Sequence, residues 1–253
     1  LDHVNIVRYI GTDRSERYLF ILMEYVPGGS IASMLTQFGS FTEELLRRFV
    51  YQILLGVDYL HERGIIHRDI KGANVLVTDG GVVKLADFGC SKQLAGMCTT
   101  NLEESLRAIR GSVPWMAPEV IKQTGIGRSA DIWSVGATII EMATGRHPWP
   151  EFTNNMAALF HVATSTEPPP TPSHLSSGCC DFINLCLVID PKKRATGKEL
   201  LLNTFLEIEV VKHQNQSTLL TNHHHLKYKR SNRIKERANR HHEREREKEK
   251  KRE

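Results

Sequence analysis

A short polar segment between two apolar ones limits what this chain can fold into more than any other feature. Residues His67 to Asn74 include two cations, an acid and an amide; they follow the apolar residues 64–66 and run directly into the apolar residues 75–77. Charged side chains are rarely buried unless they are paired. A dense polar cluster between two buried segments therefore indicates a functional site rather than an ordinary surface loop.

A second acid lies in the motif Asp87-Phe88-Gly89, and the residues that lead to it have the pattern of a β-hairpin. Residues 75–77 and 82–85 are largely apolar, and the turn-forming residues Asp79-Gly80-Gly81 lie between them. A hairpin brings its two ends together, so the pattern predicts that residues 69–74 lie close to residue 87.

The side chains that would meet there suit metal-assisted phosphoryl transfer. Asp69 and Asp87 are carboxylates and Asn74 supplies an amide oxygen, and Mg²⁺ prefers hard oxygen ligands of this kind. Phosphoryl transfer needs one carboxylate to accept the proton of an attacking hydroxyl, one to hold metal on the phosphates, and an amide for a second metal ion. An ordinary buried Asp–Arg pair would account for the first aspartate but not for the second.

The two motifs, at this spacing, resemble the catalytic loop and the Asp-Phe-Gly motif of the eukaryotic protein kinases. The resemblance implies ATP and Mg²⁺ as cofactors, with Asp69 as the catalytic base. Lys71 would steady the transferring phosphate, while Asn74 and Asp87 would bind Mg²⁺. The same resemblance gives activating or structural roles to His67, Arg68, Phe88 and Gly89.

The resemblance also predicts an α+β, protein-kinase-like fold with two lobes. Residues 1–206 would form the kinase domain, with remnant strands and the hinge of a small lobe in residues 1–25 and a mostly helical large lobe in residues 26–206. The first residue is Leu1, and the opening segment resembles the kinase segment that follows the αC helix. We therefore expect the glycine-rich loop and the ATP-binding lysine to lie upstream, and we expect this chain alone to transfer phosphate weakly or not at all.

Two extended apolar runs, residues 6–10 and 18–25, predict an antiparallel strand pair. The second run leads into Pro27-Gly28-Gly29, which resembles a kinase hinge. The resemblance implies an ATP site that includes Met23 as gatekeeper, the backbone of Glu24 and Val26, and Leu76. A plain exit from a strand into a turn is the alternative, because Pro-Gly-Gly occurs in many folds.

Two helices of the larger lobe have clear sequence signals. Residues 41–63 have apolar side chains at three- and four-residue steps, with Thr42 as the N-cap. His61, near the end of this helix, is expected to be a capping or surface residue, since a cation is favoured there. Residues 131–142 are apolar on most sides of a helix, which predicts a central position.

Residues 90–118 show little periodicity and read as a mobile loop, and their end resembles the end of a kinase activation segment. The resemblance implies that the Ser112 hydroxyl bonds Asp69 and Lys71 while a peptide substrate docks. An ordinary loop serine is the alternative.

Two further implications of the resemblance are architectural. Asp131 would bind the backbone of the catalytic loop. Glu119 would form a buried ion pair with Arg194, and loss of one partner of such a pair typically costs about 3 to 5 kcal/mol.

Phosphorylation of residues 90–118 is expected to switch the enzyme on. Arg68 lies beside the carboxylate cluster and Lys92 lies in the segment itself, and two converging cations favour a bound phosphate. Ser105 is the first candidate for the modified residue, and the others are Thr99 and Thr100. The alternative is a constitutively ordered segment in which Arg68 pairs with a resident acid, Glu103 or Glu104.

Composition favours an intracellular, cytoplasmic protein. No apolar run reaches the length of a membrane-spanning helix, and no signal-peptide pattern opens the chain. The five cysteines match neither a disulfide framework nor paired C-x-x-C metal ligands, so free thiols are expected.

Residues 207–253 are expected to form a charged, low-complexity tail that is disordered or a solvated helix. From residue 208 onward the chain has 14 Lys and Arg against 7 Asp and Glu, whereas the residues before it have 19 against 22. Such a tail buries too little apolar surface to fold alone. The run Lys227-Tyr228-Lys229-Arg230 leaves nuclear import open, but the mixed Glu/Arg runs weaken the local field, so nucleic-acid binding is not favoured.

Two classes of function remain open: an active Ser/Thr protein kinase, and a kinase-like scaffold that works by binding only. The complete set Asp69, Lys71, Asn74 and Asp87 favours catalysis, since a binding module has no evident need for all four. Lys71, two residues after the base, is typical of the Ser/Thr group by resemblance.

Within the kinases, residues 25–31, 121–136 and 141–145 most resemble the MAP kinase kinase kinases. This resemblance implies a MAP kinase kinase as the protein substrate, in a phosphorylation cascade. The upstream activator is not identified by the sequence.

Overall fold

The computed structural model describes residues 1–88, 92–93, 113–125, 127–210 and 212. The chain divides into two compact units, residues 1–207 and residues 208–253. Of the second unit only residues 208–210 and 212 are described, and they are helical.

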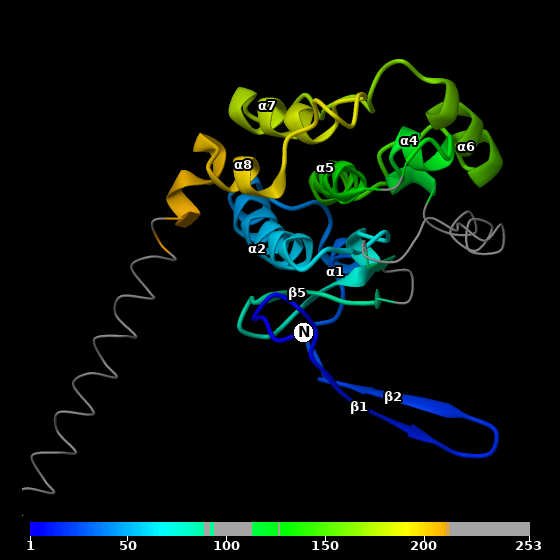
Figure 1. Ribbon diagram of the computed structural model, residues 1–253. Coiled ribbons are helices and arrows are strands. Elements are labelled where there is room, and N and C mark those ends of the chain that lie inside the picture. The colour runs from blue at the N-terminus through cyan, green and yellow to red at the C-terminus, as the bar shows by residue number, and fades with distance from the viewer. Residues whose placement is uncertain (89–91, 94–112, 126, 211, 213–253) are drawn as a thin grey trace, which may run out of the picture. The chain divides into compact units, whose positions relative to one another are not determined.

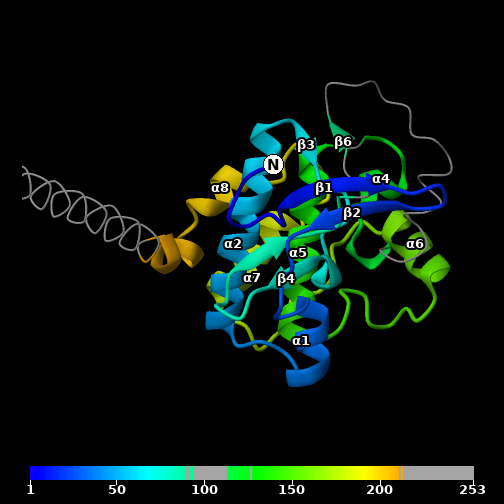
Figure 2. The ribbon, with the colours of Figure 1, turned by 90° about the horizontal axis from the view of Figure 1, so that it is seen from below.

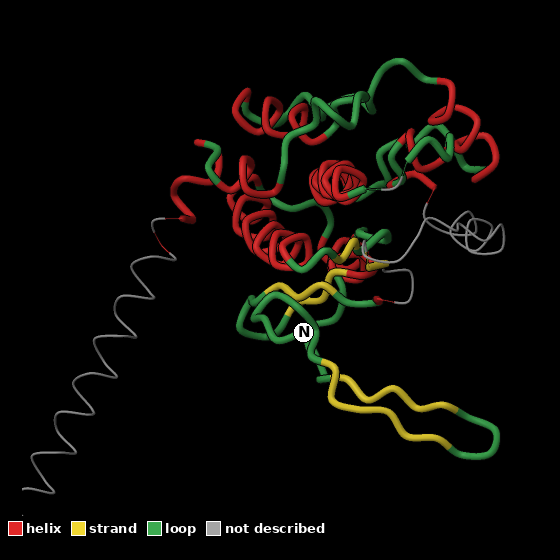
Figure 3. The backbone as a smooth tube through the Cα atoms, viewed as in Figure 1, coloured by secondary structure: helices red, strands yellow, loops and turns green. Residues whose placement is uncertain are grey.

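The first unit is a mixed α+β structure in which helices predominate and strands are short, so the predicted fold class is confirmed (Figure 1, Figure 3). Its strands are β1 (Tyr9–Arg14), β2 (Leu19–Met23), β3 (Ile65–Ile66), β4 (Val75–Val77), β5 (Val83–Leu85) and β6 (Lys92–Gln93). Its α-helices are α1 (Ile31–Phe38), α2 (Glu43–Glu62), α4 (Pro118–Ile121), α5 (Arg128–Thr144), α6 (Asn155–Thr164), α7 (Ser177–Cys186) and α8 (Gly197–Leu201). Short 3₁₀ helices are η1 (Gly72–Asn74), η3 (Val113–Trp115) and η4 (Thr204–Leu206).

The N-terminal strand pair forms, but its first strand is not where the apolar run predicts it. β1 extends to Arg14 and pairs antiparallel with β2, and the two strands lie side by side in Figure 1 and Figure 2. Ile6 and Val7 lie instead beside β5, where the N–H of Val7 donates to the carbonyl oxygen of Leu85 at 2.9 Å. Both side chains are buried. Burial beside β5, rather than pairing with β2, therefore decides the conformation of Ile6 and Val7.

α2 is the long amphipathic helix that the three- and four-residue steps predict. The side-chain oxygen of Thr42 accepts a hydrogen bond from the N–H of Leu45, and two glutamates occupy the first turn, where the helix dipole favours negative charge. The apolar face of α2 packs against α5, α8 and β5.

α5 lies at the centre of the helices of the first unit, as predicted from apolar residues on most sides of this helix. Every residue from 130 to 143 is buried, and Figure 1 shows the helix nearly end-on among its neighbours. A Cβ atom at Gly136 would lie only 2.7 Å from the Cβ of Cys186. Glycine therefore allows the close packing of α5 against α7.

The β4–β5 hairpin is confirmed. Its antiparallel register pairs Val75 with Leu85 and Val77 with Val83. The residues that precede β4 and follow β5 therefore lie next to each other, as the polar motifs require.

Among the described residues, every helix is too short or too polar to span a lipid bilayer. The described cysteines Cys179, Cys180 and Cys186 are free thiols, which agrees with the expectation from their spacing.

Candidate active site

The polar cluster forms a loop between β3 and β4 that ends in the 3₁₀ turn η1. The ammonium of Lys71 lies 3.1 and 2.9 Å from the two carboxylate oxygens of Asp69. The side-chain amide of Asn74 donates to the Asp69 carboxylate at 2.7 Å and to the Asp69 carbonyl oxygen at 2.8 Å. Three of the predicted catalytic residues therefore form one hydrogen-bonded cluster.

The second carboxylate reaches this cluster through the hairpin. The N–H of Ala86 donates to the carbonyl oxygen of Asn74 at 2.9 Å. The next residue, Asp87, therefore lies beside the end of the catalytic loop. Asp87 has a φ of 61°, a left-handed conformation that Asp and Asn adopt more readily than most residues. The loop brings Asp69 and Asn74 together, and the hairpin adds Asp87 to them.

A buried carboxylate on α5 holds the backbone of the loop. Asp131 is 1% exposed and accepts hydrogen bonds from the N–H of His67 at 2.9 Å and from the N–H of Arg68 at 2.8 Å. Arg68 has a φ of 72°, which is unfavourable for a side chain of this size. The two bonds to Asp131 stabilise this conformation immediately before Asp69.

His67 connects the loop to the second motif. Its ring is fully buried, its Nε2 lies 3.0 Å from the carbonyl oxygen of Ala86, and its ring lies 5.1 Å from that of Phe88. A carbonyl oxygen only accepts hydrogen bonds, so Nε2 carries the proton. Burial lowers the pKa of His67, although Asp131 and the Ala86 carbonyl act in the opposite direction. The N–H of Asp69 donates to Nδ1 at 3.4 Å, so the ring accepts at one nitrogen, donates at the other and ties the loop to the residues around Asp87.

The residues expected to surround adenine divide into two groups. Val26 and Ala86 are buried together with Val7, and Leu76 packs against this cluster while remaining partly exposed. Met23, at the end of β2, is 49% exposed and lies outside the cluster.

Glu24 follows Met23, and its carboxylate forms an ion pair with Lys84 of β5 at 2.6 Å. The hydrogen bond from Lys84 lowers the pKa of Glu24. Its backbone N–H donates to the carbonyl oxygen of Arg8.

Glu119 and Arg194 form a buried ion pair with two parallel hydrogen bonds of 2.6 and 3.0 Å. Arg194 also donates to the carbonyl oxygens of Ser129 and Val188. The pair joins α4 to the loop before α8 and to the start of α5.

The side chains of eight residues singled out from the sequence are not described by the structure. Gly89, Ser105 and Ser112 lie outside the described residues, and so do Thr99, Thr100, Glu103 and Glu104. The backbone of Lys92 pairs with Ile66 in β6, while its side chain is not described.

The prediction that His61 is a capping or surface residue is wrong, because its ring binds Asp131 and Arg63 is the C-cap of α2. The residue is buried, and its Nε2 lies 2.8 Å from the Asp131 carboxylate. It follows Val57 by one turn on the buried face of α2, so the helical period alone places it inward. The Asp131 carboxylate is thus bonded by two backbone N–H groups of the catalytic loop and by one ring of α2.

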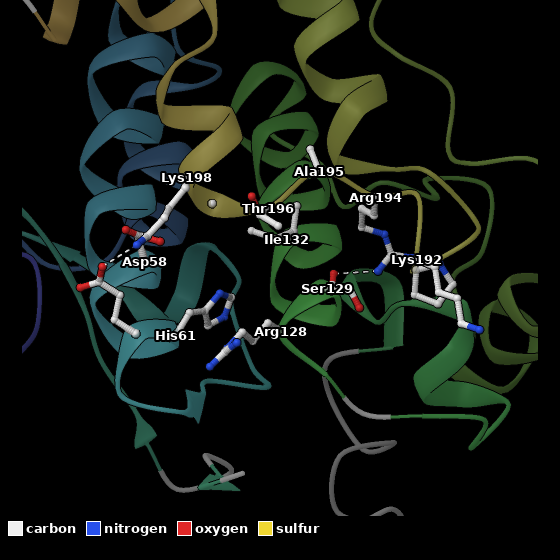
Figure 4. A pocket seen from close by; sticks show the side chains of 13 residues that line it. Asp58, His61, Arg128, Ser129, Ile132, Lys192, Arg194, Ala195, Thr196 and Lys198 are labelled. Carbon is white, nitrogen blue, oxygen red and sulfur yellow. Dashed lines mark hydrogen bonds and ion pairs between the residues drawn. The ribbon is translucent and has the colours of Figure 1, made fainter.

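A cavity of about 430 Å³ is lined by residues of α2, by the start of α5, and by residues 191–192 and 194–198 (Figure 4). His61 and Arg194 line it, and an exposed ion pair between Lys198 and Glu62 lies at its edge. Asp69, Asn74 and Asp87 are not among its lining residues, so this cavity is separate from the catalytic cluster.

The family model of the protein kinase domain matches residues 1–206. Mitogen-activated protein kinase kinase kinase 2 of Arabidopsis thaliana is 51% identical over 206 residues, which are 81% of this chain and 31% of that protein. Mitogen-activated protein kinase kinase kinase A of Dictyostelium discoideum is 48% identical over 206 residues, 81% of this chain and 21% of that protein. The human mitogen-activated protein kinase kinase kinase 19 is 45% identical over 210 residues, 82% of this chain and 16% of that protein.

The chain thus spans less than a third of the length of these three relatives. The residues matched by the family model include the catalytic loop, the hairpin and the helices that hold both. The chain belongs to the protein kinase family, and within that family it is about half identical to mitogen-activated protein kinase kinase kinases.

Proposed function

We propose that this chain is the catalytic domain of a protein serine/threonine kinase that phosphorylates a MAP kinase kinase. The observation that carries the proposal is the bonded cluster of Asp69, Lys71 and Asn74, with Asp87 brought beside it by the backbone bond between Ala86 and Asn74. The similarity to mitogen-activated protein kinase kinase kinases supports the choice of substrate.

In the proposed reaction, the oxygen of a serine or threonine hydroxyl attacks the γ-phosphorus of ATP. The bond between that phosphorus and the bridging oxygen breaks, and ADP leaves with the bridging oxygen. The hydroxyl proton passes to the Asp69 carboxylate. Lys71 and Asn74 hold this carboxylate through N–H donors, which fixes its direction before the substrate arrives.

The donor set suits Mg²⁺. The N–H₂ of Asn74 is used by Asp69, which directs the amide oxygen away from Asp69, and Asp87 lies next to that residue. Among the described residues no group of three His, Cys, Asp or Glu side chains could form a metal site by itself. Mg²⁺ is commonly held by one or two carboxylates together with substrate phosphates. When bound, the ion would neutralise charge on those phosphates.

The proposed organisation assigns residues 1–206 to the kinase domain and residues 207–253 to a basic tail. We further propose a cytoplasmic location, which the free thiols of Cys179, Cys180 and Cys186 support because such thiols persist in reducing compartments. The mildly acidic domain and the mixed charges of the tail do not favour nucleic acid as a partner.

The direct test of the metal assignment is Asp87→Asn in enzyme expressed from the complete reading frame. Asparagine tolerates the left-handed backbone at this position, so the fold should not change. Loss of one charged ligand is expected to weaken Mg·ATP binding about 10- to 100-fold, while the weak binding of metal-free ATP stays unchanged. Calorimetric titrations with and without Mg²⁺ measure both. An unchanged affinity for Mg·ATP would contradict the assignment of Asp87.

A second prediction concerns substrate choice. Arginine-directed kinases resemble this chain but have acids at the positions of Ser30 and Ala73. Without a carboxylate at these positions, an arginine in the substrate gains little binding energy. In a positional peptide library, arginine upstream of the phosphorylated residue is expected to stay within about fivefold of alanine, the range of an exposed ion pair. The exposed Ala73 allows a matched variant, since Ala73→Glu should raise the preference for arginine. Arginine-rich peptides selected by the wild type would contradict the prediction.

A further inference from the structure

A buried acid on α5, Glu141, has no role in the site described above. It is 7% exposed in a helix whose other side chains are mostly apolar. Burial raises the pKa of its carboxyl, while hydrogen bonds from Gly72 and Trp115 and the nearby Lys71 act in the opposite direction. Burial of a carboxyl is costly unless the group is hydrogen-bonded, so the partners of Glu141 are informative.

One of its bonds reaches the catalytic loop. The N–H of Gly72 donates to Glu141 Oε2 at 2.8 Å. A Cβ atom at residue 72 would lie 2.5 Å from the other oxygen of the same carboxylate. A larger residue at position 72 would therefore force the Glu141 carboxylate to move, so glycine permits this close approach between Lys71 and the remainder of the turn η1.

The other bond reaches the segment before α4. The indole N–H of Trp115 donates to the same Oε2 atom at 2.8 Å, and the backbone carbonyl of Trp115 accepts from the Ser134 hydroxyl at 2.9 Å. Trp115 lies in η3, three residues before α4 begins at Pro118. One carboxylate oxygen therefore joins the catalytic loop to the C-terminal end of residues 90–118.

Glu141 and Asp131 hold opposite ends of the loop. Asp131 binds the N–H groups of residues 67 and 68, and Glu141 binds the N–H of residue 72, so Asp69 lies between two anchor points. Both acids are on α5, ten residues and about 15 Å of helix apart. The helix is rigid and buried, so the two carboxylates set the span of the loop.

We propose that Glu141 is a positioning residue that fixes the Lys71–Asn74 half of the catalytic loop and couples it to Trp115. The proposal rests on the proposed function for its effect on catalysis, whereas the loop anchoring is a property of this chain alone. Asp131 secures the first half of the loop, and Glu141 secures the half that orients Lys71 and Asn74 toward Asp69.

Hydrogen exchange in this chain tests the anchoring without any activity measurement. Glu141→Ala removes the acceptor of Gly72, and the cavity of about 410 Å³ that Glu141 lines gives water access to the vacated space. The amide of Gly72 is expected to exchange about 5- to 150-fold faster, as for loss of a buried hydrogen bond. The amides of His67 and Arg68, held by Asp131, should keep their rates.

Two matched variants make the exchange test specific. Glu141→Gln should preserve the protection of Gly72, because both donors use one oxygen and an amide oxygen can replace it. Glu151→Ala, at an exposed position, removes one negative charge without touching the loop and should change nothing. Equal acceleration at residues 67, 68 and 72 in Glu141→Ala would indicate general loosening and would overturn the proposal, as would no acceleration at Gly72.

A double-mutant cycle tests the contact itself. Gly72→Ala should lower the urea midpoint of the wild type because its methyl group meets the Glu141 carboxylate. In the Glu141→Ala background the shift should be less than half as large. Equal shifts in both backgrounds would show that this contact does not exist in solution.

Turnover in enzyme from the complete reading frame tests the catalytic part. Glu141→Ala should lower kcat about 10- to 100-fold with little change in the KM for ATP, and Glu141→Gln should restore most of it. A fall in thermal stability with unchanged kcat would reduce Glu141 to a structural residue. If the wild type transferred no phosphate, the proposed function would be wrong. The hydrogen-exchange experiment would still show whether Glu141 anchors the catalytic loop.

Discussion

Asp69→Asn is expected to lower the rate of protein phosphorylation by about 10²- to 10⁴-fold, the usual contribution of a positioned general base. The amide keeps the shape of the carboxylate but cannot accept the proton of the substrate hydroxyl. Its oxygen can still accept the 2.7 Å hydrogen bond from Asn74. Binding of Mg·ATP should therefore be nearly unchanged, and the loss should appear in kcat.

The matched control is Asp79→Asn, the same chemical change at an exposed position in the turn between β4 and β5. Steady-state rates and nucleotide binding are to be measured for both variants in enzyme from the complete reading frame. Turnover of Asp69→Asn near the wild-type rate would rule out the base assignment. That result would favour the alternative function, a kinase-like scaffold that works by binding only.

The parts of the fold that follow from local signals could be predicted from the sequence. The β4–β5 hairpin has a turn sequence between two apolar runs, and α2 has a capping threonine and a helical apolar period. Each signal lies within about 20 residues of the chain, and turn and capping residues act through their own backbone. The proximity of Asn74 and Asp87 could therefore be predicted from local signals alone.

The bonds that hold the site together join residues far apart in sequence. His61 and Asp131 are 70 positions apart, and Gly72 and Glu141 are 69 positions apart. A buried polar side chain needs a partner, but no periodic pattern says which residue provides it. Asp131 and Glu141 are nevertheless recognisable from the sequence as residues that need partners, because an acid within an otherwise apolar helix is costly unless it is bonded.

Backbone conformation in the loop is set by tertiary contacts and overrides local preference. A φ of 72° favours glycine or asparagine, yet Arg68 adopts it because Asp131 binds the two adjacent N–H groups. Ile6 similarly follows burial beside β5 rather than the apolar run that suggested pairing with β2. Neither feature has a local cause that sequence reasoning could have used.

Arg194→Ala is expected to lower the free energy of unfolding by about 3 to 5 kcal/mol, the typical cost of removing one partner of a buried ion pair. The variant leaves the buried Glu119 carboxylate without its two bonds from the guanidinium. It also removes the donors to the carbonyl oxygens of Ser129 and Val188. Urea denaturation measures the effect as a lower midpoint with an unchanged slope.

Lys198→Ala is the matched control, because it removes an ion pair of nearly equal length in a different environment. The Lys198–Glu62 pair spans 2.7 Å with side chains that are 65% and 51% exposed, whereas the Arg194–Glu119 pair spans 2.6 Å with side chains that are 0% and 7% exposed. Solvent-exposed pairs contribute little to stability, so the control should barely shift the midpoint. Arg194→Lys should fall between the two, since an ammonium keeps the charge but cannot form two parallel bonds. Equal shifts for Arg194→Ala and Lys198→Ala would mean that burial does not determine what the Glu119–Arg194 pair contributes.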